Sequence, residues 1–295
     1  MKETLLFIDA NSLVHRTFHA LPPLTTPQGE PSGALYGLSS VLLKLAKEQR
    51  PTYIAAFFDR QEPTFRDKLY ADYKANRPPT DNKLLPQIKE APTLLEMFGI
   101  RTFSEAGFEA DDLIGTFVEH FKKTPDLTII VLSGDQDLMQ LVEDDRIFMQ
   151  YMRKGITDFT LYNEDAVIKK FGFMPVQLPD YKGLIGDASD NIPGVPGIGP
   201  KTASDLLRAH GTLEEIFKNT SKLPPLLQKK FEGREEQALL SKNLATIHRL
   251  ATISKPRLAD LTLRSLDEAR LAPYFENLGF QSLVKRLYNT THTLF

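Results

Sequence analysis

Residues 185–203 read IGDASDNIPGVPGIGPKTA and combine two kinds of chemistry in one short stretch. Asp187 and Asp190 are three positions apart, so the end of a helix would direct both carboxylates to one side. The glycines and prolines that follow, with Lys201, precede an apolar pattern of helical period. Glycine lets a backbone approach a partner closely, and a helix N-terminus offers free N–H groups to an anion. The stretch therefore predicts a metal site beside a phosphate site, as in a metal-dependent enzyme that acts on a nucleic-acid backbone.

Length and composition are those of a globular protein with one large domain or two smaller ones. The 295 residues are 41% hydrophobic and 25% charged, and none is cysteine. The absence of cysteine excludes disulfides and thiolate zinc sites and fits a reducing cytosol. The first residues, MKETLLFIDA, contain a short apolar run that ends at Asp9, which predicts a strand and not a signal peptide. No stretch is long enough to cross a bilayer, so we expect no membrane partner.

The net charge of −2 is unusual for a DNA-binding protein, so the distribution of charge is more informative than the total. Residues 1–193 contain 21 Lys and Arg against 28 Asp and Glu, whereas residues 194–295 contain 15 against 10. Nine acids identified below as candidate ligands all lie in the first segment, and without them its balance changes from −7 to +2. If these acids bind cations, the remaining surface is positive enough to attract a polyanion.

Strand and helix patterns alternate in the first half of the chain. Apolar runs rich in β-branched residues predict strands at 4–8, 52–58, 100–103 and 127–132. Helical period is found at 34–47, 84–98 and 109–122, and Pro92 predicts a kink or break in the second of these helices. The alternation predicts an α/β domain with a mainly parallel central sheet flanked by helices. From about residue 174, helical patterns joined by Gly and Pro predict a helical second domain.

Three predicted strands are followed by an acid, namely Asp9, Asp59 and Asp135. Because ligands gather at the carboxyl ends of parallel strands, these side chains can converge at one edge of the sheet. Each of the other acidic clusters, taken by itself, has an ordinary explanation, because acidic residues are favoured at the N-caps and in the first turns of helices. Together the candidates are nine carboxylates: Asp9, Asp59, Glu109, Asp111, Asp112, Asp135, Asp137, Asp187 and Asp190. So many like charges at one place would repel each other unless bound cations neutralise them. Because all the ligands are oxygen atoms, the cations indicated are Mg²⁺ or Mn²⁺. Two such ions can hold a phosphate between them during displacement at phosphorus.

The segment at 60–84, RQEPTFRDKLYADYKANRPPTDNKL, is too polar to form a core element. Its basic residues are interleaved with Phe65, Tyr70 and Tyr73, which suits a single strand with phosphates on the cations and bases on the rings. An exposed loop with solvated charges explains this composition equally well. A long insertion beside an active site is often a lid or gate. Nearer the N-terminus, Arg16 is a further candidate ligand for a phosphate.

The motifs of the chain follow one another in an order that resembles a known family. They are FIDANSLVHRTFHAL, FFDRQEPTFR, YKANR, FEADDLIGT, LSGDQDLMQL, GLIGDASDNIPGVPGIGPKTA and YFENLGFQSLVKRL. With these motifs the chain resembles the 5′ nuclease (5′→3′ exonuclease) domain of bacterial DNA polymerase I, in the flap-endonuclease superfamily, over essentially its whole length. The resemblance implies a PIN-like α/β fold with a helical C-terminal domain. It also implies a divalent-ion hydrolase that releases the 5′ end of a DNA strand at nicks, flaps and forks.

The resemblance assigns a role to each candidate residue. It places Asp9, Asp59, Glu109 and Asp111 mainly on a first ion and Asp135, Asp137 and Asp190 mainly on a second, with Asp112 and Asp187 in support. Lys74 and Arg77 would lie on a helical arch over about residues 60–84 and steady the scissile phosphate, while Arg16, Arg66 and Tyr73 would contact DNA. GVPGIGPKTA matches a helix–hairpin–helix element that grips a duplex phosphate, in the family often with K⁺, through Gly194, Gly197, Gly199, Lys201 and Thr202.

The reaction implied is phosphodiester hydrolysis by two-metal-ion catalysis, in replication primer removal and repair. The expected domains are residues 1–174 for the nuclease and 175–295 for the helical DNA-binding part. The expected partners are branched or nicked DNA, with or without an RNA primer on the 5′ flap, and a DNA polymerase in the same or a separate chain. We expect a monomer in the bacterial cytoplasm, associated with the nucleoid. A catalytically silent DNA-binding module and a related ribonuclease are the alternatives.

Overall fold

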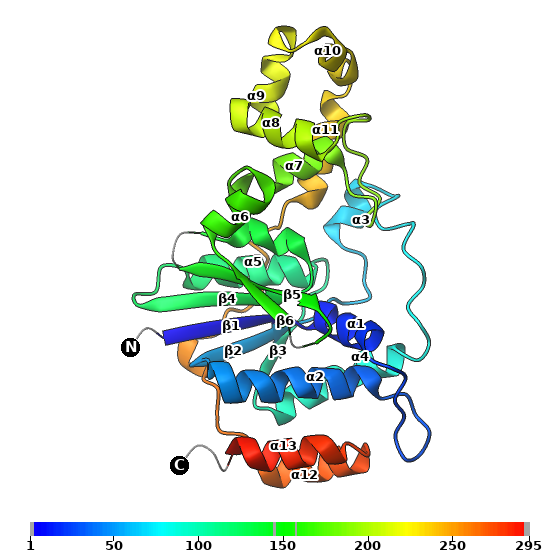
Figure 1. Cartoon of the computed structure of the whole chain (residues 1–295), viewed down its shortest axis with the longest axis vertical. Helices are drawn as coiled ribbons and strands as arrows, with labels where there is room; N and C mark the ends of the chain where they lie inside the picture. Colours follow the sequence, from blue (N-terminus) through cyan, green and yellow to red (C-terminus); the bar gives the residue numbers. More distant parts are fainter. Residues whose placement is uncertain (1–2, 144–145, 157, 292–295) are drawn as a thin grey trace.

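A six-stranded sheet lies at the centre of the computed structural model, which describes residues 3–143, 146–156 and 158–291 (Figure 1). In spatial order β3-β2-β1-β4-β5-β6, its strands are β1 (Glu3–Asp9), β2 (Tyr53–Phe57), β3 (Arg101–Phe103), β4 (Leu127–Ser133), β5 (Ile147–Lys154) and β6 (Asp158–Tyr162). β1 to β5 run parallel to one another, and β6, at the edge, runs antiparallel to β5. The predicted α/β class with a mainly parallel sheet is therefore confirmed.

The central strand β1 is buried on both faces, which explains its continuous apolar sequence. Leu5 and Phe7 belong to one hydrophobic core and Leu6 and Ile8 to the other, because successive side chains of a strand point to opposite faces. Phe7 packs edge-to-face on Phe57 of β2, with ring centroids 5.3 Å apart. This two-sided burial fixes the register of the strand and hence the position of Asp9 at its carboxyl end.

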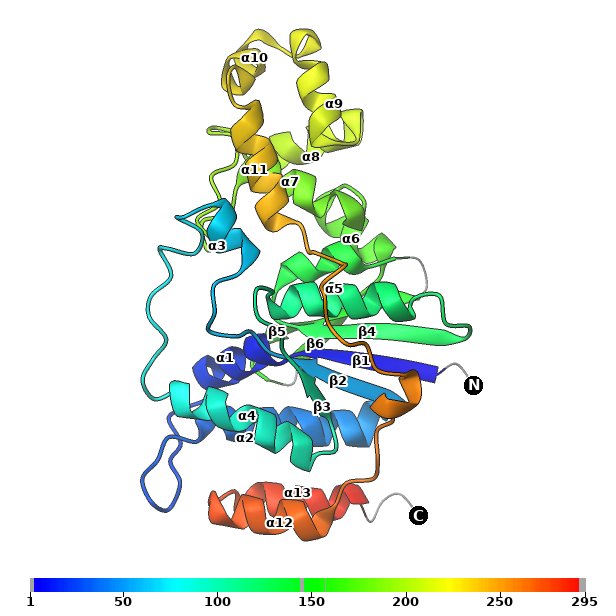
Figure 2. The ribbon, with the colours of Figure 1, turned by 180° about the vertical axis from the view of Figure 1, so that it is seen from behind.

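Helices cover both faces of the sheet (Figure 2). On one face α5 (Ala110–Phe121) packs against β1 and β2. On the other face lie α1 (Ala10–Ala20), α2 (Gly33–Lys44) and α4 (Leu85–Met97), and a π-helical turn (Leu45–Gln49) extends α2. α4 continues through Pro92, so the predicted break in this helix does not occur. The fully buried Ala91 and Leu94 hold the helix to the core on both sides of the proline.

A group of helices extends away from the sheet on the side that α5 covers (Figure 1). They are α6 (Glu164–Phe171), α7 (Leu178–Ile185), α8 (Pro200–His210), α9 (Leu213–Lys218), α10 (Pro225–Phe231) and α11 (Glu235–Ala245). α7 and α11 pack together through Leu184 and Ala238, and the same core continues into α5 and β4. The predicted helical second part is confirmed, and it is joined to the sheet through buried apolar side chains. No helix among the described residues is long and apolar enough to cross a membrane.

The two last helices lie apart from the other C-terminal helices and pack beside α2, which covers one face of the sheet. α12 (Glu268–Asn277) and α13 (Gln281–Thr291) lie against α2 on the far side of the molecule from α8 to α10 (Figure 2). Leu271 and Phe275 are fully buried there, and the Arg286 guanidinium donates to the hydroxyl of Ser40 at 2.5 Å. An amphipathic pattern shows that one face of a helix is buried but not against which partner, so the sequence could not place this pair.

The predicted helical arch is mostly not helical. Within residues 60–84 the only helix is α3 (Phe65–Leu69), capped by Thr64, and turns follow it. Pro78 and Pro79 have no N–H to donate and end any further helix. The strand β1 is followed directly by α1, since Asp9 accepts from the N–H of Ser12 and serves as the N-cap of that helix.

Candidate active site

The three acids that follow strands lie at one edge of the sheet. The carboxylate of Asp9 accepts from the hydroxyl of Ser133 at 2.5 Å. Asp59 accepts from the N–H of Ala110 and from the side-chain amide of Asn11, both at 2.7 Å. All three acids line a cavity of about 220 Å³, whose wall consists of Asp9, Asn11, Ser12, His15, Asp59, Lys74, Arg77, Glu109, Ala110, Asp111 and Asp135. The structure thus brings together the acids that the strand pattern selected.

The start of α5 supplies the next acids to the same cavity. Glu109 is the N-cap of α5, and its N–H donates to Asp112 at 3.1 Å in a capping box. Glu109 and Asp111 face the cavity, whereas Asp112 is completely buried and points away from it. The helix start therefore divides neighbouring carboxylates between two different environments.

Asp112 forms a buried ion pair with Arg66, which corrects two predictions. Two nitrogens of the Arg66 guanidinium donate to the two Asp112 oxygens at 2.7 and 2.8 Å, and the Arg66 side chain is 3% exposed. Arg66 also donates to the main-chain carbonyls of Leu244 and Thr246 at 2.8 and 2.9 Å. Arg66 is consequently not accessible to DNA, and Asp112 is not open to a metal ion. Their role is to join α3, α5 and the end of α11.

A second acidic group lies beside the first. Asp137 follows Asp135 in the turn after β4, and its N–H donates to Asp135 at 2.9 Å. Asp187 follows α7, and it pairs through main-chain N–H and C=O bonds of 2.8 Å with Ile192, which closes a tight turn. Between Asp137 and Asp187 lies the ammonium of Lys182, a residue that the sequence analysis did not select. The sequence contains only a weak indication of Lys182, namely a single lysine in the apolar stretch directly before Asp187.

Burial and like charges act strongly on this site. Burial raises the pKa of Asp9 to about 7, although hydrogen bonds from Ser133 and Ser12 oppose the shift. The pKa of Asp111 is also raised well above its ordinary value by burial and by the neighbouring carboxylates, of which Asp9 is the strongest. Burial likewise raises the pKa of Asp137 to about 7, with a further contribution from Asp135. The site therefore holds more negative charge than its own surroundings compensate.

The segment 70–77 lies across these acids and pairs with them. Lys74 donates to Glu109 at 2.6 Å, and Arg77 forms an ion pair with Asp190. Lys74 has a left-handed backbone (φ 56°), and its N–H donates to the carbonyl of Asp190 at 2.9 Å. Tyr73 was predicted to contact DNA, but its ring is buried and its hydroxyl lies 3.3 Å from Glu109. Lys74 and Arg77 therefore lie at the acids, whereas Tyr73 is part of the packing.

The donor types in the cavity fit a hard divalent cation. All the acids offer carboxylate oxygens, and the Oδ1 atom of Asn11 is buried without a hydrogen-bond partner in the described part of the chain. Within the described ranges, however, no three acidic or histidine side chains are grouped closely enough to hold an ion as they stand. Two of the acids, Glu109 and Asp190, are instead paired with Lys74 and Arg77.

The glycine-rich stretch forms a hairpin that leads into α8. Gly194 (φ 61°) lies so close to Gly186 that a Cβ atom would be 2.2 Å from the Gly186 nitrogen. Gly197 (φ 81°) accepts from the ammonium of Lys230 at 2.6 Å, and Gly199 is the N-cap of α8. Lys201 is exposed and Thr202 half-buried in the first turn of α8, whose N–H groups have no partner within the helix. The hairpin therefore presents the backbone donors that an anion requires.

Arg16 is half-buried, and one nitrogen of its guanidinium is engaged by main-chain carbonyls. It donates to the main-chain carbonyl of Met152 at 3.3 Å and to that of Arg153. These contacts hold α1 to the end of β5. The residues that the sequence analysis missed at the cavity are Asn11, Ser12 and His15, all close to Asp9 in the chain. Their proximity to a strand-end acid was the signal that could have identified them.

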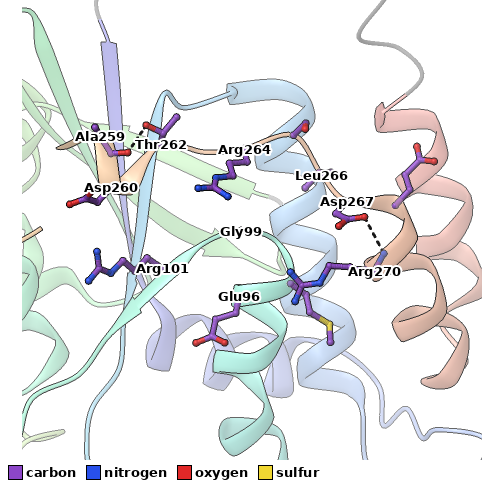
Figure 3. Close-up of a pocket in the computed structure, with 13 residues that line it drawn as sticks. Glu96, Gly99, Arg101, Ala259, Asp260, Thr262, Arg264, Leu266, Asp267 and Arg270 are labelled. Carbon is purple, nitrogen blue, oxygen red and sulfur yellow. Dashed lines mark hydrogen bonds between the residues drawn. The ribbon is translucent and has the colours of Figure 1, made fainter. Parts of the chain in front are cut away.

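A larger cavity lies elsewhere in the described part of the chain. It has a volume of about 900 Å³ and lies between the start of β3 and the segment that leads to α12 (Figure 3). Arg101, Arg264 and Arg270 project around it together with the acids Glu96, Asp260 and Asp267 (Figure 3). Arg101 begins β3, so this cavity is at the amino end of the strands, opposite to Asp9 and Asp59. It shares no residue with the acidic site.

Comparison with protein families gives a match over nearly the whole chain. Residues 4–172 match the 5′–3′ exonuclease N-terminal resolvase-like domain, and residues 173–269 match the 5′–3′ exonuclease C-terminal SAM fold. The DNA polymerase I of Caldicellulosiruptor bescii is 40% identical over 286 residues, which are 96% of this chain and 33% of that protein. The chain thus spans about a third of the length of the DNA polymerase I relatives that it matches.

A relative of similar length and several solved structures agree with this match. The 5′–3′ exonuclease of Aquifex aeolicus is 36% identical over 97% of this chain and 95% of its own. The T5 5′-exonuclease with bound zinc ions has a TM-score of 0.70 at 20% identity, covering 98% of this chain and 100% of that one. The catalytic core of Rad2 in complex with DNA substrate has a TM-score of 0.65 at 15% identity, covering 98% and 92%. With both domains matched in order, the chain belongs to the 5′–3′ exonuclease family.

Proposed function

We propose that this chain is a divalent-metal-dependent 5′ nuclease that hydrolyses phosphodiester bonds at 5′ ends, nicks and flaps of DNA. The observation that carries the proposal is the single cavity that joins Asp9, Asp59 and Asp135 with the start of α5, directly beside the turn that leads into the hairpin. Membership of the 5′–3′ exonuclease family supports the same reaction. The T5 and Rad2 structures, which contain divalent metal ions and DNA respectively, share the fold.

The residues that would hold Mg²⁺ or Mn²⁺ are the carboxylates around the cavity. They are Asp9, Asp59, Glu109, Asp111 and Asp135, with Asp137, Asp187 and Asp190 in the neighbouring group. When bound, such an ion supplies a Lewis acid and lowers the pKa of a water ligand. Lys74 and Arg77 would then exchange their carboxylate partners for the oxygens of the scissile phosphate, which carries more negative charge in the transition state. The nine-carboxylate assignment is thereby reduced to eight, since Asp112 is committed to Arg66.

The hairpin would bind the phosphate backbone of a duplex. Its support is the pair of N–H groups at Lys201 and Thr202 in the first turn of α8, next to the exposed Lys201 ammonium. The carbonyl of Gly197 already accepts from Lys230, which is the kind of contact that a K⁺ ion would also make. Binding through phosphates releases counterions, so the affinity for DNA should fall steeply with salt.

The biological setting follows from the relatives. Because the chain matches one third of DNA polymerase I proteins, we propose that it acts in primer removal and repair beside a DNA polymerase, in the same chain or a separate one. We further propose a monomer in the bacterial cytoplasm at the nucleoid, and 5′ flaps that carry an RNA primer as one class of substrate. The meeting point of the two family matches, at residues 172 and 173, supports a domain boundary near residue 174.

The test compares cleavage of a labelled 5′ flap with DNA or RNA in its 5′ arm, in Mg²⁺, Mn²⁺, Ca²⁺ or chelator. We expect Mg²⁺- and Mn²⁺-dependent release of a short 5′ product from the DNA flap. Asp135→Ala should abolish cleavage while flap binding in Ca²⁺ is largely retained. Asp165→Ala, at an exposed acid in the first turn of α6, is the matched control and should cleave normally.

Three results would contradict this proposal in different ways. Binding without cleavage in every metal indicates the silent DNA-binding module. Cleavage restricted to RNA arms indicates a ribonuclease. Normal cleavage by Asp135→Ala would remove the acidic cavity from the mechanism.

A further inference from the structure

Lys182 occupies the centre of the second acidic group. Its ammonium lies 2.8 Å from Oδ1 of Asp137 and forms a second ion pair with Asp187. The three side chains are each between 14% and 17% exposed, so water screens their interaction only partly. Burial alone would lower the pKa of Lys182, but Asp137 and Asp187 outweigh it, and the pKa is raised. Lys182 is therefore a charged group held between two carboxylates.

The position of Lys182 connects the two acidic groups. Lys182 lines a cavity of about 480 Å³ together with Asp137 and Asp187. Ser12 and Asp135 belong to this cavity and also to the one that contains Asp9 and Asp59. A divalent ion shared by Asp135 and Asp137 would thus be next to a fixed ammonium. Two cations at one carboxylate repel each other strongly where water is partly excluded.

Lys182 differs from the other cations of the site in how it is held. Lys74 and Arg77 lie in turns outside regular structure, and the side chain of Arg77 is 48% exposed. Lys182 instead lies within α7, between the buried Tyr181 and Leu184. Its backbone is therefore fixed by the core that joins α7 to α11. Only rotation of its own side chain can remove its charge from the acids.

We propose that Lys182 is a built-in cation of the second acidic group. Its ammonium takes the place that a divalent ion would otherwise share with Asp137 and Asp187, so the protein without DNA binds one divalent ion tightly and a second one weakly. Lys182 is a positioning residue, because it acts on the ion through the carboxylates. The inference rests on the proposed function, since it concerns the same metal site.

The experiment counts bound ions and does not depend on cleavage. Full-length protein without DNA is titrated with Mn²⁺ in mildly alkaline buffer, and free Mn²⁺ is measured by its electron paramagnetic resonance signal. The variants are Lys182→Met, which removes the charge, and Lys182→Arg, which keeps it. Lys242→Met is the matched control, because Lys242 is a comparably buried lysine that pairs with Asp180 of the same helix and with Glu214. If Lys182→Met melts early, Lys182→Gln replaces it, since glutamine can still donate to the carboxylates.

The expected result is a second Mn²⁺ bound at least about tenfold more tightly by Lys182→Met than by the parent protein, because a like charge beside the ion has gone. Lys182→Arg and Lys242→Met should keep the parent isotherm. An unchanged or weaker second site in the uncharged Lys182 variant overturns the role of Lys182 while leaving the nuclease proposal intact. Binding of no Mn²⁺ by the parent protein or any variant overturns the role of Lys182, and the nuclease proposal falls with it only if the 5′ flap is also not cleaved in Mn²⁺.

Discussion

The buried pair of Arg66 and Asp112 provides the most demanding test of the structure. Arg66→Met removes a guanidinium that makes two charged bonds to Asp112 and two bonds to carbonyls at the C-terminal end of α11, those of Leu244 and Thr246. Asp112 is 0% exposed and also accepts from the N–H of His248 at 2.8 Å. The substitution therefore leaves a buried carboxylate without its cation at the point where three segments meet.

The expected loss of stability is large. Removal of one partner from a buried ion pair costs about 3–5 kcal/mol, because the remaining charge is desolvated and uncompensated. The side chains are 3% and 0% exposed, so no discount for solvent screening applies. Arg66→Lys keeps the charge but loses the two-pronged geometry, and we expect it to cost about half as much. The double variant Arg66→Met/Asp112→Asn should recover part of the loss, because it removes the uncompensated charge.

The assay combines urea unfolding with DNA binding. The free energy of unfolding is measured for the parent, the two single variants and the double variant, by tyrosine fluorescence and by circular dichroism. DNA affinity is then measured at several salt concentrations under conditions where Arg66→Met is folded. A buried Arg66 makes no phosphate contact, so the slope of log affinity against log salt should stay unchanged.

Two results would refute this reasoning. A loss below about 1 kcal/mol for Arg66→Met would mean that the pair is hydrated in solution. A fall in the salt slope of about one unit in the folded variant would mean that Arg66 contacts a phosphate after all, as the sequence analysis expected.

Three further predictions concern the acids and the hairpin. Asp9→Asn, measured in chelator, should raise the free energy of unfolding by about 1–2 kcal/mol at about pH 8 and by less at about pH 5. The reason is that folding raises the pKa of Asp9 from 3.8 to about 7, so the ionised carboxylate increasingly destabilises the fold as pH rises through that window. Equal effects at both pH values in urea titrations would contradict this. Gly194→Ala should destabilise the protein by at least about 3 kcal/mol, because its Cβ would meet the Gly186 backbone at a positive φ; a Tm within a degree or so of the parent would show that the turn relaxes. Insertion of one residue between Asp190 and Gly197 should shift or blur the cut position on a 5′ flap more than it weakens binding, since this turn ties the acids to the hairpin; an unchanged cut site on a sequencing gel would exclude a measuring role.

Local patterns sufficed for much of the sheet. β1, β2 and β4 are continuous apolar runs, and an acid directly after such a run needs only the strand prediction to be placed. β5 and β6 were missed for a physical reason. β5 mixes polar and apolar residues (IFMQYMRK), and β6 is a short antiparallel strand at the edge of the sheet that reads DFTLY. Neither has the continuous hydrophobicity by which a buried parallel strand is identified.

The basic segment at 60–84 marks the limit of sequence reasoning. Its composition is equally that of a solvated loop and of a strand-binding arch. Arg66 is nevertheless among the most buried charged residues of the described chain. Its partners Asp112 and the carbonyl of Leu244 lie 46 and 178 positions away in the sequence. Pairings over such separations depend on the path of the whole chain, and no local pattern records them.

The sequence by itself determined the kinds of group in the site: carboxylates after the strands, lysines and arginines in the polar segment, and glycines in the hairpin. These follow from local rules for strand ends, turns and helix starts. Tertiary structure decided which cation neutralises which acid, with Arg66 on Asp112, Lys74 on Glu109, Arg77 on Asp190, and Lys182 on Asp137 and Asp187. An ion pair forms only where two segments approach to within a few ångströms. The packing of α7, α11 and α5 decides where that happens, and the spacing of charges along the chain does not.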